Sequence, residues 1–148
     1  SAPFIKFIEQ ELQPFIERNY RTTPEKTLIG QSLGGLLATE ILFTKPDMFD
    51  NYIIVSPSLW WNDEYLIKKR TKPVVYTTNK KIFVAVGKEG DIMEREAKEL
   101  YERLDKVKKD NTQLYFQFFE NQNHGDVLHV AVYSAFEHLF MKHEDAKK

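Results

Sequence analysis

A serine stands at the centre of a short glycine-flanked motif. The run Gly30-Gln31-Ser32-Leu33-Gly34 matches the pattern G-x-S-x-G and directly follows the apolar, β-branched run Thr27-Leu28-Ile29. In this pattern, small flanking residues permit a strained turn from a strand into a helix, which lifts the serine hydroxyl above the sheet. The dipole of the following helix can stabilise developing negative charge. We therefore predict that Ser32 is a nucleophile; the alternative is a tight structural Gly-Ser turn.

One of the four histidines directly follows a predicted strand. His124 lies in the polar, glycine-containing loop 120–126, whereas His129, His138 and His143 lie on or after the predicted final helix. A histidine in such a loop can reach a serine at the end of another strand and act as a general base. His124 is the predicted base, and the other three are interpreted as surface or packing residues.

Such a pair normally has a third member, an acid that orients the imidazole and stabilises its charged form. In α/β-hydrolases the chain order is nucleophile, acid, histidine. Between Ser32 and His124, one predicted strand end carries acids directly after it, in the loop 87–91. Glu89 or Asp91 is therefore the candidate, and we favour Glu89 because Asp91 is also placed to cap the following helix. In the alternative reading, both are solvated loop acids.

Groups near the serine suggest further roles. The backbone N–H of Leu33, directly after the serine, is the predicted first donor of an oxyanion hole. The second donor normally comes from a loop before the nucleophile strand, and the residues before Thr27 offer only a helix and a turn. The missing second donor supports the alternative of a non-catalytic module. We assign Gln31, Trp60 and Trp61 to substrate binding, although paired tryptophans after a strand also occur as core packing.

Composition excludes several classes of function. The absence of cysteine rules out a thiolate nucleophile, a disulfide framework and a cysteine zinc site. No histidine pair follows the H-E-x-x-H pattern, and we predict neither a metal nor another cofactor. The 21 basic and 22 acidic residues nearly cancel, so neither nucleic acid nor a membrane is an expected partner. The chain lacks a run of roughly 18 apolar residues and a signal-peptide pattern, which favours a soluble, cytoplasmic protein.

Apolar periodicity predicts the elements that position these residues. The expected strands alternate with helices and cover residues 27–29, 52–56, 81–86 and 114–119. The expected helices are an N-terminal one that Pro14 should kink, then 36–43, 92–107 and 130–140, while 58–78 is interpreted as a loop with a short helix. This alternation predicts an α/β fold of about four strands and three to four helices. Its parallel sheet is covered on both faces, and sites form at the strands' carboxyl ends.

Three runs carry a resemblance to a known family. They are residues 20–37, which contain the serine motif, Ser56-Pro57-Ser58-Leu59-Trp60-Trp61, and Asn123-His124-Gly125. They resemble the putative esterase family of α/β-hydrolases, which includes esterase D and the enterobactin-type trilactone esterases. The similarity covers nearly the whole chain and matches only the C-terminal half of that family. It implies that Ser32 is the nucleophile, that His124 is the base and that the acid lies in the loop after Gly87. In some relatives the site resembles a serine–histidine dyad, in which the acid is weak or replaced.

The residues and the resemblance together predict a function. We expect a carboxylic ester hydrolase that acts on a small-molecule ester through an acyl-serine intermediate. Acyl transfer to an alcohol or amine would use the same residues. A truncated, non-catalytic interaction module is the alternative from another class.

The resemblance also implies an incomplete sheet. We expect one domain, residues 1–148, that forms the C-terminal catalytic half of an α/β-hydrolase and is inactive if it needs the missing oxyanion donor. In the family's strand order, 27–29 lies inside the sheet, beside strands that this chain does not contain. Here it would become an apolar edge that neither Pro24 nor Lys26 blocks. We therefore expect self-association through this edge, or a missing N-terminal segment beside it.

Overall fold

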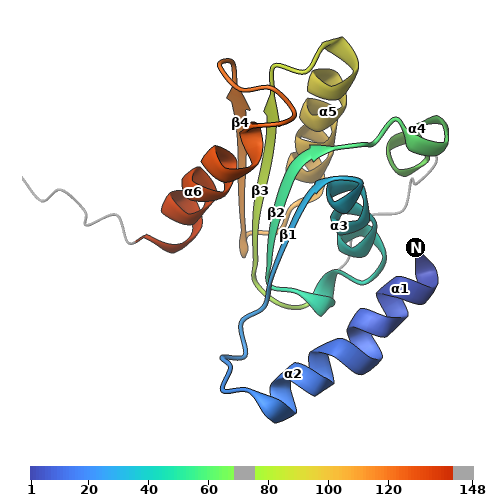
Figure 1. Cartoon of the computed structure of the whole chain (residues 1–148), viewed down its shortest axis with the longest axis vertical. Helices are drawn as coiled ribbons and strands as arrows, with labels where there is room; N and C mark the ends of the chain where they lie inside the picture. The colour runs from blue at the N-terminus through green and yellow to red at the C-terminus, as the bar shows by residue number, and fades with distance from the viewer. Residues whose placement is uncertain (69–75, 142–148) are drawn as a thin grey trace, which may run out of the picture.

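A four-stranded parallel sheet lies at the centre of the computed structural model, which describes residues 1–68 and 76–141. The strands lie side by side in sequence order (Figure 1). They are β1 (Thr27–Ser32), β2 (Asn51–Pro57), β3 (Lys80–Gly87) and β4 (Thr112–Phe119). In the register, Ile53 of β2 lies opposite Ile29 of β1 and Phe83 of β3. The parallel α/β arrangement predicted from the alternation of strands and helices is confirmed.

Helices cover both faces of the sheet. The connecting helices α3 (Leu33–Thr44) and α5 (Asp91–Val107) lie on one face, and α6 (Val127–Phe140) crosses back to the other (Figure 1). Because parallel crossovers are right-handed, a sheet that grows in one direction keeps its connecting helices on one side. In the described part of the chain, none of the helices has the length and apolarity needed to cross a membrane.

Two apolar cores result from this layering. Tyr52, Ile54 and Val84 point toward α3 and α5, whereas Ile53 and Phe83 point toward α6. Successive side chains of a strand point to opposite faces. The central strands β2 and β3 are therefore buried on both faces, which explains why they appear in the sequence as continuous apolar runs.

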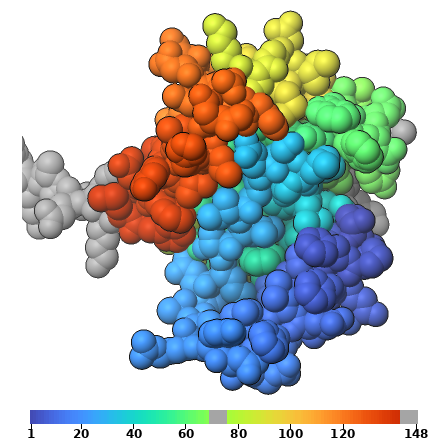
Figure 2. Space-filling model, viewed as in Figure 1, coloured from blue at the N-terminus to red at the C-terminus, as the bar shows by residue number. Residues whose placement is uncertain are grey.

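A nearly continuous helical run opens the chain. It consists of α1 (Ala2–Phe7), the π-helical turn η1 (Ile8–Leu12) and α2 (Gln13–Asn19). The predicted kink at Pro14 takes the form of this wider turn. Proline lacks the N–H that continues the helical ladder, and its ring crowds the preceding turn. Ile5 and Ile8 pack into the core on the α3 side, and the run lies along one end of the molecule (Figure 2).

Several element boundaries differ from the prediction. β1 continues to Ser32 rather than ending at Ile29, because Gly30 and Gln31 still pair with β2. Directly after it, α3 begins at Leu33. The segment 58–78 contains the short helix α4 (Trp61–Lys68), in agreement with the expected loop and short helix, and residues 69–75 of this segment lie outside the described residues.

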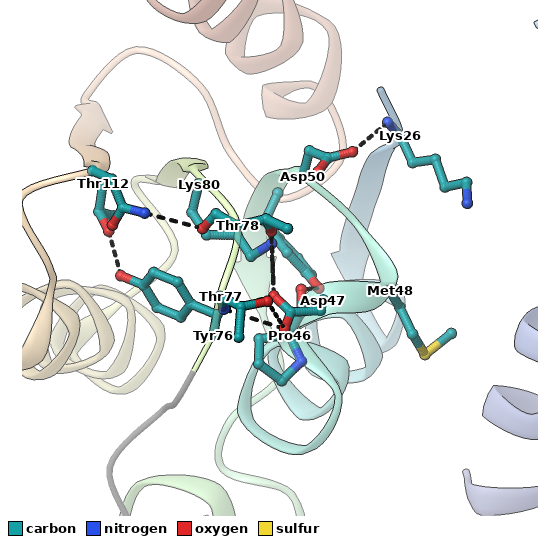
Figure 3. A network of polar contacts seen from close by, with 12 residues as sticks. Lys26, Pro46, Asp47, Met48, Asp50, Tyr76, Thr77, Thr78, Lys80 and Thr112 are labelled. Atoms are coloured by element: carbon teal, nitrogen blue, oxygen red, sulfur yellow. Dashed lines mark hydrogen bonds and ion pairs between the residues drawn. The ribbon is translucent and has the colours of Figure 1, made fainter. Parts of the chain in front are cut away.

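A polar network lies at the start of β3, at the end of the sheet opposite the serine motif (Figure 3). Asp47 of the short helix η2 (Pro46–Met48) accepts hydrogen bonds from the Thr77 hydroxyl at 2.9 Å and the Thr78 hydroxyl at 3.2 Å. Its carboxylate also lies 3.3 Å from the Nζ of Lys80, whose side chain is fully buried. Because a buried ammonium group needs a charge partner, this network fixes the start of β3.

Candidate active site

Ser32 lies at the sharp turn from β1 into α3, at the carboxyl edge of the sheet. Its backbone angles are φ 57° and ψ −120°, a conformation that side-chain-bearing residues rarely adopt. Gly30 makes the turn possible, because a Cβ there would lie 2.2 Å from the carbonyl oxygen of Gly34. The turn makes Leu33 the first residue of α3, so its N–H belongs to the positively polarised helix terminus.

Glu89 and His124 form a close pair. Glu89 follows β3 and His124 lies in the loop after β4, and Glu89 Oε2 lies 2.5 Å from His124 Nδ1. The Glu89 side chain is only 3% exposed, whereas that of His124 is 46% exposed. A buried carboxylate requires hydrogen-bond donors. The other oxygen, Oε1, accepts bonds from the Gly87 N–H at 2.9 Å and the Ser56 hydroxyl at 2.5 Å. Since Nδ1 faces the acid, Nε2 of His124 remains available for proton transfer.

Two hydrogen bonds hold the His124 loop over the sheet. Because the strand order is β1-β2-β3-β4, the loop after β4 must pass over β3 and β2 to approach Ser32. The backbone N–H of Lys88 donates to the carbonyl of Gln122 at 2.7 Å. Nearer the serine, the Gln31 side-chain amide donates to the backbone carbonyl of His124, also at 2.7 Å. Gln31, which we assigned to substrate binding, therefore contacts the loop that carries the predicted base.

Of the predicted site residues, one hollow of about 510 Å³ brings together Ser32, Glu89, His124 and Trp60. It is lined by Ser32, Ser58, Trp60, Lys88, Glu89, Met93, Asn123 and His124. The Ser32 hydroxyl lies 3.3 Å from that of Ser58, and this is the hydrogen bond that it makes among the described residues. Catalytic hydrogen bonds are often long or misaligned without substrate, so this geometry is compatible with a Ser32–His124 transfer.

The two tryptophans form an exposed aromatic surface at this hollow. Trp60 is 47% exposed and lines the hollow, and Trp61 is 55% exposed and packs on Trp60 with ring centroids 5.8 Å apart. Trp61 is not among the lining residues. Because both side chains are exposed, the alternative that this pair serves as core packing is wrong.

Asp91 lies apart from the cluster. It is the exposed first residue of α5 and lines a different hollow with Glu94 and Arg95. The expectation that Asp91 caps α5 is wrong, because Gly90 is the N-cap residue. The Glu94 carboxylate reaches back and accepts the N–H groups of Glu89 and Gly90, each at 3.0 Å. A side chain from inside the helix thus satisfies the free donors at its start.

The other described histidines have different surroundings. The ring of His138 packs between two aromatic rings, with centroid distances of 5.6 Å to Phe83 and 5.2 Å to Tyr115. His129 is exposed on α6. His143 lies outside the described residues. Both described residues fit the interpretation as packing and surface histidines.

Two serines at the end of β2 lie in a run that carries the family resemblance, but the sequence assigned them no role. The hydroxyl of Ser56 contacts Glu89, and Ser58 contacts Ser32 through its hydroxyl and through its N–H, which donates to the Ser32 carbonyl at 3.1 Å. Their position in the sequence could have indicated a role in the site. Both flank Pro57 at the carboxyl end of a buried strand, the edge at which sites form in parallel sheets.

Known proteins resemble this chain over most of its length. The family model described as Putative esterase matches residues 2–144. The chain is 38% identical over 152 residues to the ferri-bacillibactin esterase BesA of Bacillus subtilis (strain 168), an alignment that covers 96% of the chain and 52% of that protein.

Solved structures give the same picture. The BES protein from Bacillus cereus superposes with a TM-score of 0.85 at 36% identity, over 93% of this chain and 55% of that one. An IroE-like serine hydrolase from Shewanella oneidensis gives 0.82 at 28% identity, over 94% and 47% of the two chains. The chain therefore spans about half the length of these relatives.

Proposed function

The chain belongs to the Putative esterase family, and from this premise we propose that it carries the catalytic residues of a serine hydrolase that cleaves carboxylic esters. One observation carries the proposal. A buried carboxylate lies 2.5 Å from an imidazole, in the same hollow as a serine on a strained strand-to-helix turn. Ser32, Glu89 and His124 also follow one another in the order nucleophile, acid, histidine.

In the first half-reaction, the Ser32 Oγ attacks the ester carbonyl carbon while His124 Nε2 accepts the hydroxyl proton. The oxyanion that forms accepts a hydrogen bond from the Leu33 N–H at the start of α3. Glu89 stabilises the imidazolium through Nδ1. The C–O bond to the alcohol then breaks, Nε2 gives its proton to the departing alcohol oxygen, and the acyl group stays on Ser32.

Water completes the cycle by the same route. His124 Nε2 takes a proton from the water as its oxygen attacks the acyl carbon. The second tetrahedral intermediate collapses and breaks the bond to Ser32 Oγ. The proton returns from Nε2 to Oγ, and the carboxylic acid leaves. Every step uses residues that line one hollow or that stand at the start of α3.

For the substrate, we propose an ester of the siderophore class. Relatives of this chain are named as esterases of bacillibactin and of triacetylfusarinine C. The walls of the hollow support such a ligand. Trp60 offers an exposed aromatic face and Lys88 offers a positive charge.

A fluorophosphonate probe tests the nucleophile in the complete protein. We expect one covalent adduct by intact-mass analysis, and no adduct on Ser32→Ala. Ser134→Ala is the matched control, because it removes a hydroxyl on α6 away from the hollow and should label as wild type does. Bacillibactin hydrolysis should fall at least about 10³-fold in Ser32→Ala. A wild-type protein without an adduct, or an equal adduct on Ser32→Ala, would overturn the proposal.

We also propose that β1 is a contact edge. In the described part of the chain β1 pairs with β2 on one side only, and Ile29 is 43% exposed. An apolar edge with unpaired N–H and C=O groups is a template for pairing with another strand. We expect the 148-residue chain to self-associate in light scattering at micromolar concentration. A stable monomer that unfolds cooperatively would contradict this proposal.

A further inference from the structure

The carboxyl end of β2 contains a one-residue irregularity at Ser56. Gln31 of β1 lies opposite Val55, but the next residue, Ser32, lies opposite Pro57, so Ser56 is left over in the register. Its φ is 44°, in the left-handed region that is unfavourable for residues with a side chain. Bulges of this kind next to active sites re-aim a side chain.

The bulge directs the side chain of Ser56 itself, which is buried. Ser56 is 0% exposed, and its hydroxyl donates to Glu89 Oε1 at 2.5 Å. The N–H of Gly87 donates to the same oxygen at 2.9 Å. Two donors from two neighbouring strands therefore hold Oε1, and Oε2 faces His124. A carboxylate held at three points has a single orientation, which is what an orienting acid requires.

We propose that Ser56 is a positioning residue that fixes Glu89 against His124. The inference rests on the proposed function, since it assigns Ser56 a task in the same reaction. Ser56 does not line the hollow, so it acts through Glu89 and not on the substrate. This task accounts for the strained backbone of Ser56. A regular continuation of β2 would pair Ser56 with Ser32 and turn the Ser56 hydroxyl away from Glu89.

The test compares Ser56→Ala with Ser134→Ala in the complete protein. The Ser134 hydroxyl also donates to a side-chain oxygen at 2.5 Å, but on the far helix α6. With an aryl ester as probe, Ser56→Ala should lower kcat by roughly tenfold to a hundredfold at unchanged KM, because it removes a hydrogen bond to a charged group. Ser134→Ala should leave both values unchanged. Ser56→Gly, which relieves the positive φ, should lose as much kcat as Ser56→Ala.

A double-mutant cycle separates positioning from general damage. In a Glu89→Ala background, Ser56→Ala should cause no further loss of kcat, because the group that it positions is gone. An equal loss in both backgrounds, or no loss in wild type, overturns the inference.

A second readout does not depend on turnover. The downfield proton resonance of the His124–Glu89 hydrogen bond should weaken or shift in Ser56→Ala and stay unchanged in Ser134→Ala. If that resonance is identical in Ser56→Ala and wild type, the inference fails, whether or not the protein cleaves esters. The proposed function fails separately, through the fluorophosphonate test on Ser32.

Discussion

Gln31 and His124 stand 93 positions apart in the sequence, and a 2.7 Å hydrogen bond joins the side-chain amide of one to the backbone carbonyl of the other. Gln31 is the neighbour of Ser32, so this bond ties the loop of the predicted base to the turn of the predicted nucleophile. Strand β1 and the loop after β4 belong to opposite edges of the sheet. The distance between nucleophile and base therefore depends on a contact that spans the sheet.

Removal of this tie should slow ester hydrolysis. We expect Gln31→Ala to lower kcat by about tenfold, because the His124 loop loses a fixed contact near the serine. Gln31→Glu should be more damaging than Gln31→Ala, since its carboxylate would not only lack a donor but also repel the His124 carbonyl oxygen. Gln113→Ala, an exposed position on β4, is the control. If Gln31→Ala retains the wild-type kcat, other contacts hold the loop.

The identity of the acid can be tested with two isosteric changes. Glu89→Gln should lower kcat by at least about a hundredfold, because a neutral amide cannot support the imidazolium. Asp91→Asn should stay within about twofold of wild type, since Asp91 lines a different hollow. Steady-state kinetics on an aryl ester measures both. If Asp91→Asn lowered kcat more than Glu89→Gln, the acid would be Asp91. If neither change lowered kcat, the site would be a Ser32–His124 dyad.

Asp47 should matter for stability rather than for catalysis. Asp47→Ala leaves the fully buried Lys80 ammonium group without its carboxylate, and we expect a loss of about 3 kcal/mol in the free energy of unfolding. The control Asp105→Ala breaks the exposed ion pair with Lys108 and should cost far less, because solvent screens exposed pairs. Urea denaturation measures both. Equal losses would mean that Lys80 finds another partner.

Glu96 should make stability depend on pH. Burial, and then the nearby Glu64 carboxylate, raise the pKa of Glu96 above its ordinary value of 4.5, against the opposing effect of Arg95. Its Oε2 is buried without a hydrogen-bond partner in the described part of the chain. A raised carboxyl pKa means that the folded state holds the proton more tightly, so stability falls as pH rises through and above 4.5.

The neutral variant Glu96→Gln should therefore be more stable than wild type at pH 7, by about 1 kcal/mol. Arg95 keeps Glu64 and Glu99 as partners, so the variant leaves no unpaired cation. Urea denaturation should show the gain shrinking as pH falls toward about 4.5 and absent below it. Glu102→Gln, an exposed change on the same helix, should show no such trend. A gain that is equal at pH 4 and pH 7 would contradict the role of charge.

Local signals in the sequence were enough to predict the elements and the family. Buried strands appear as short apolar runs, and amphipathic helices repeat with a period of 3.6, so the alternation that defines the parallel sheet is visible without coordinates. The same holds for the G-x-S-x-G turn at Ser32, because Gly30 is required by an approach to Gly34 only four residues away. His124 was singled out because it lies directly after a predicted strand.

Contacts between distant residues were decided by the tertiary structure. Which loop acid meets His124 depends on how far Glu89 reaches from the end of β3, and the cap of α5 depends on Glu94 folding back over Gly90. The tie from Gln31 to His124 depends on the strand order. Ser56 reaches Glu89 because the register shifts by one residue beside Ser32, and a one-residue shift changes the direction of every side chain that follows. Sequence patterns report periodicity along the chain, whereas register and strand order arise only when the strands pair.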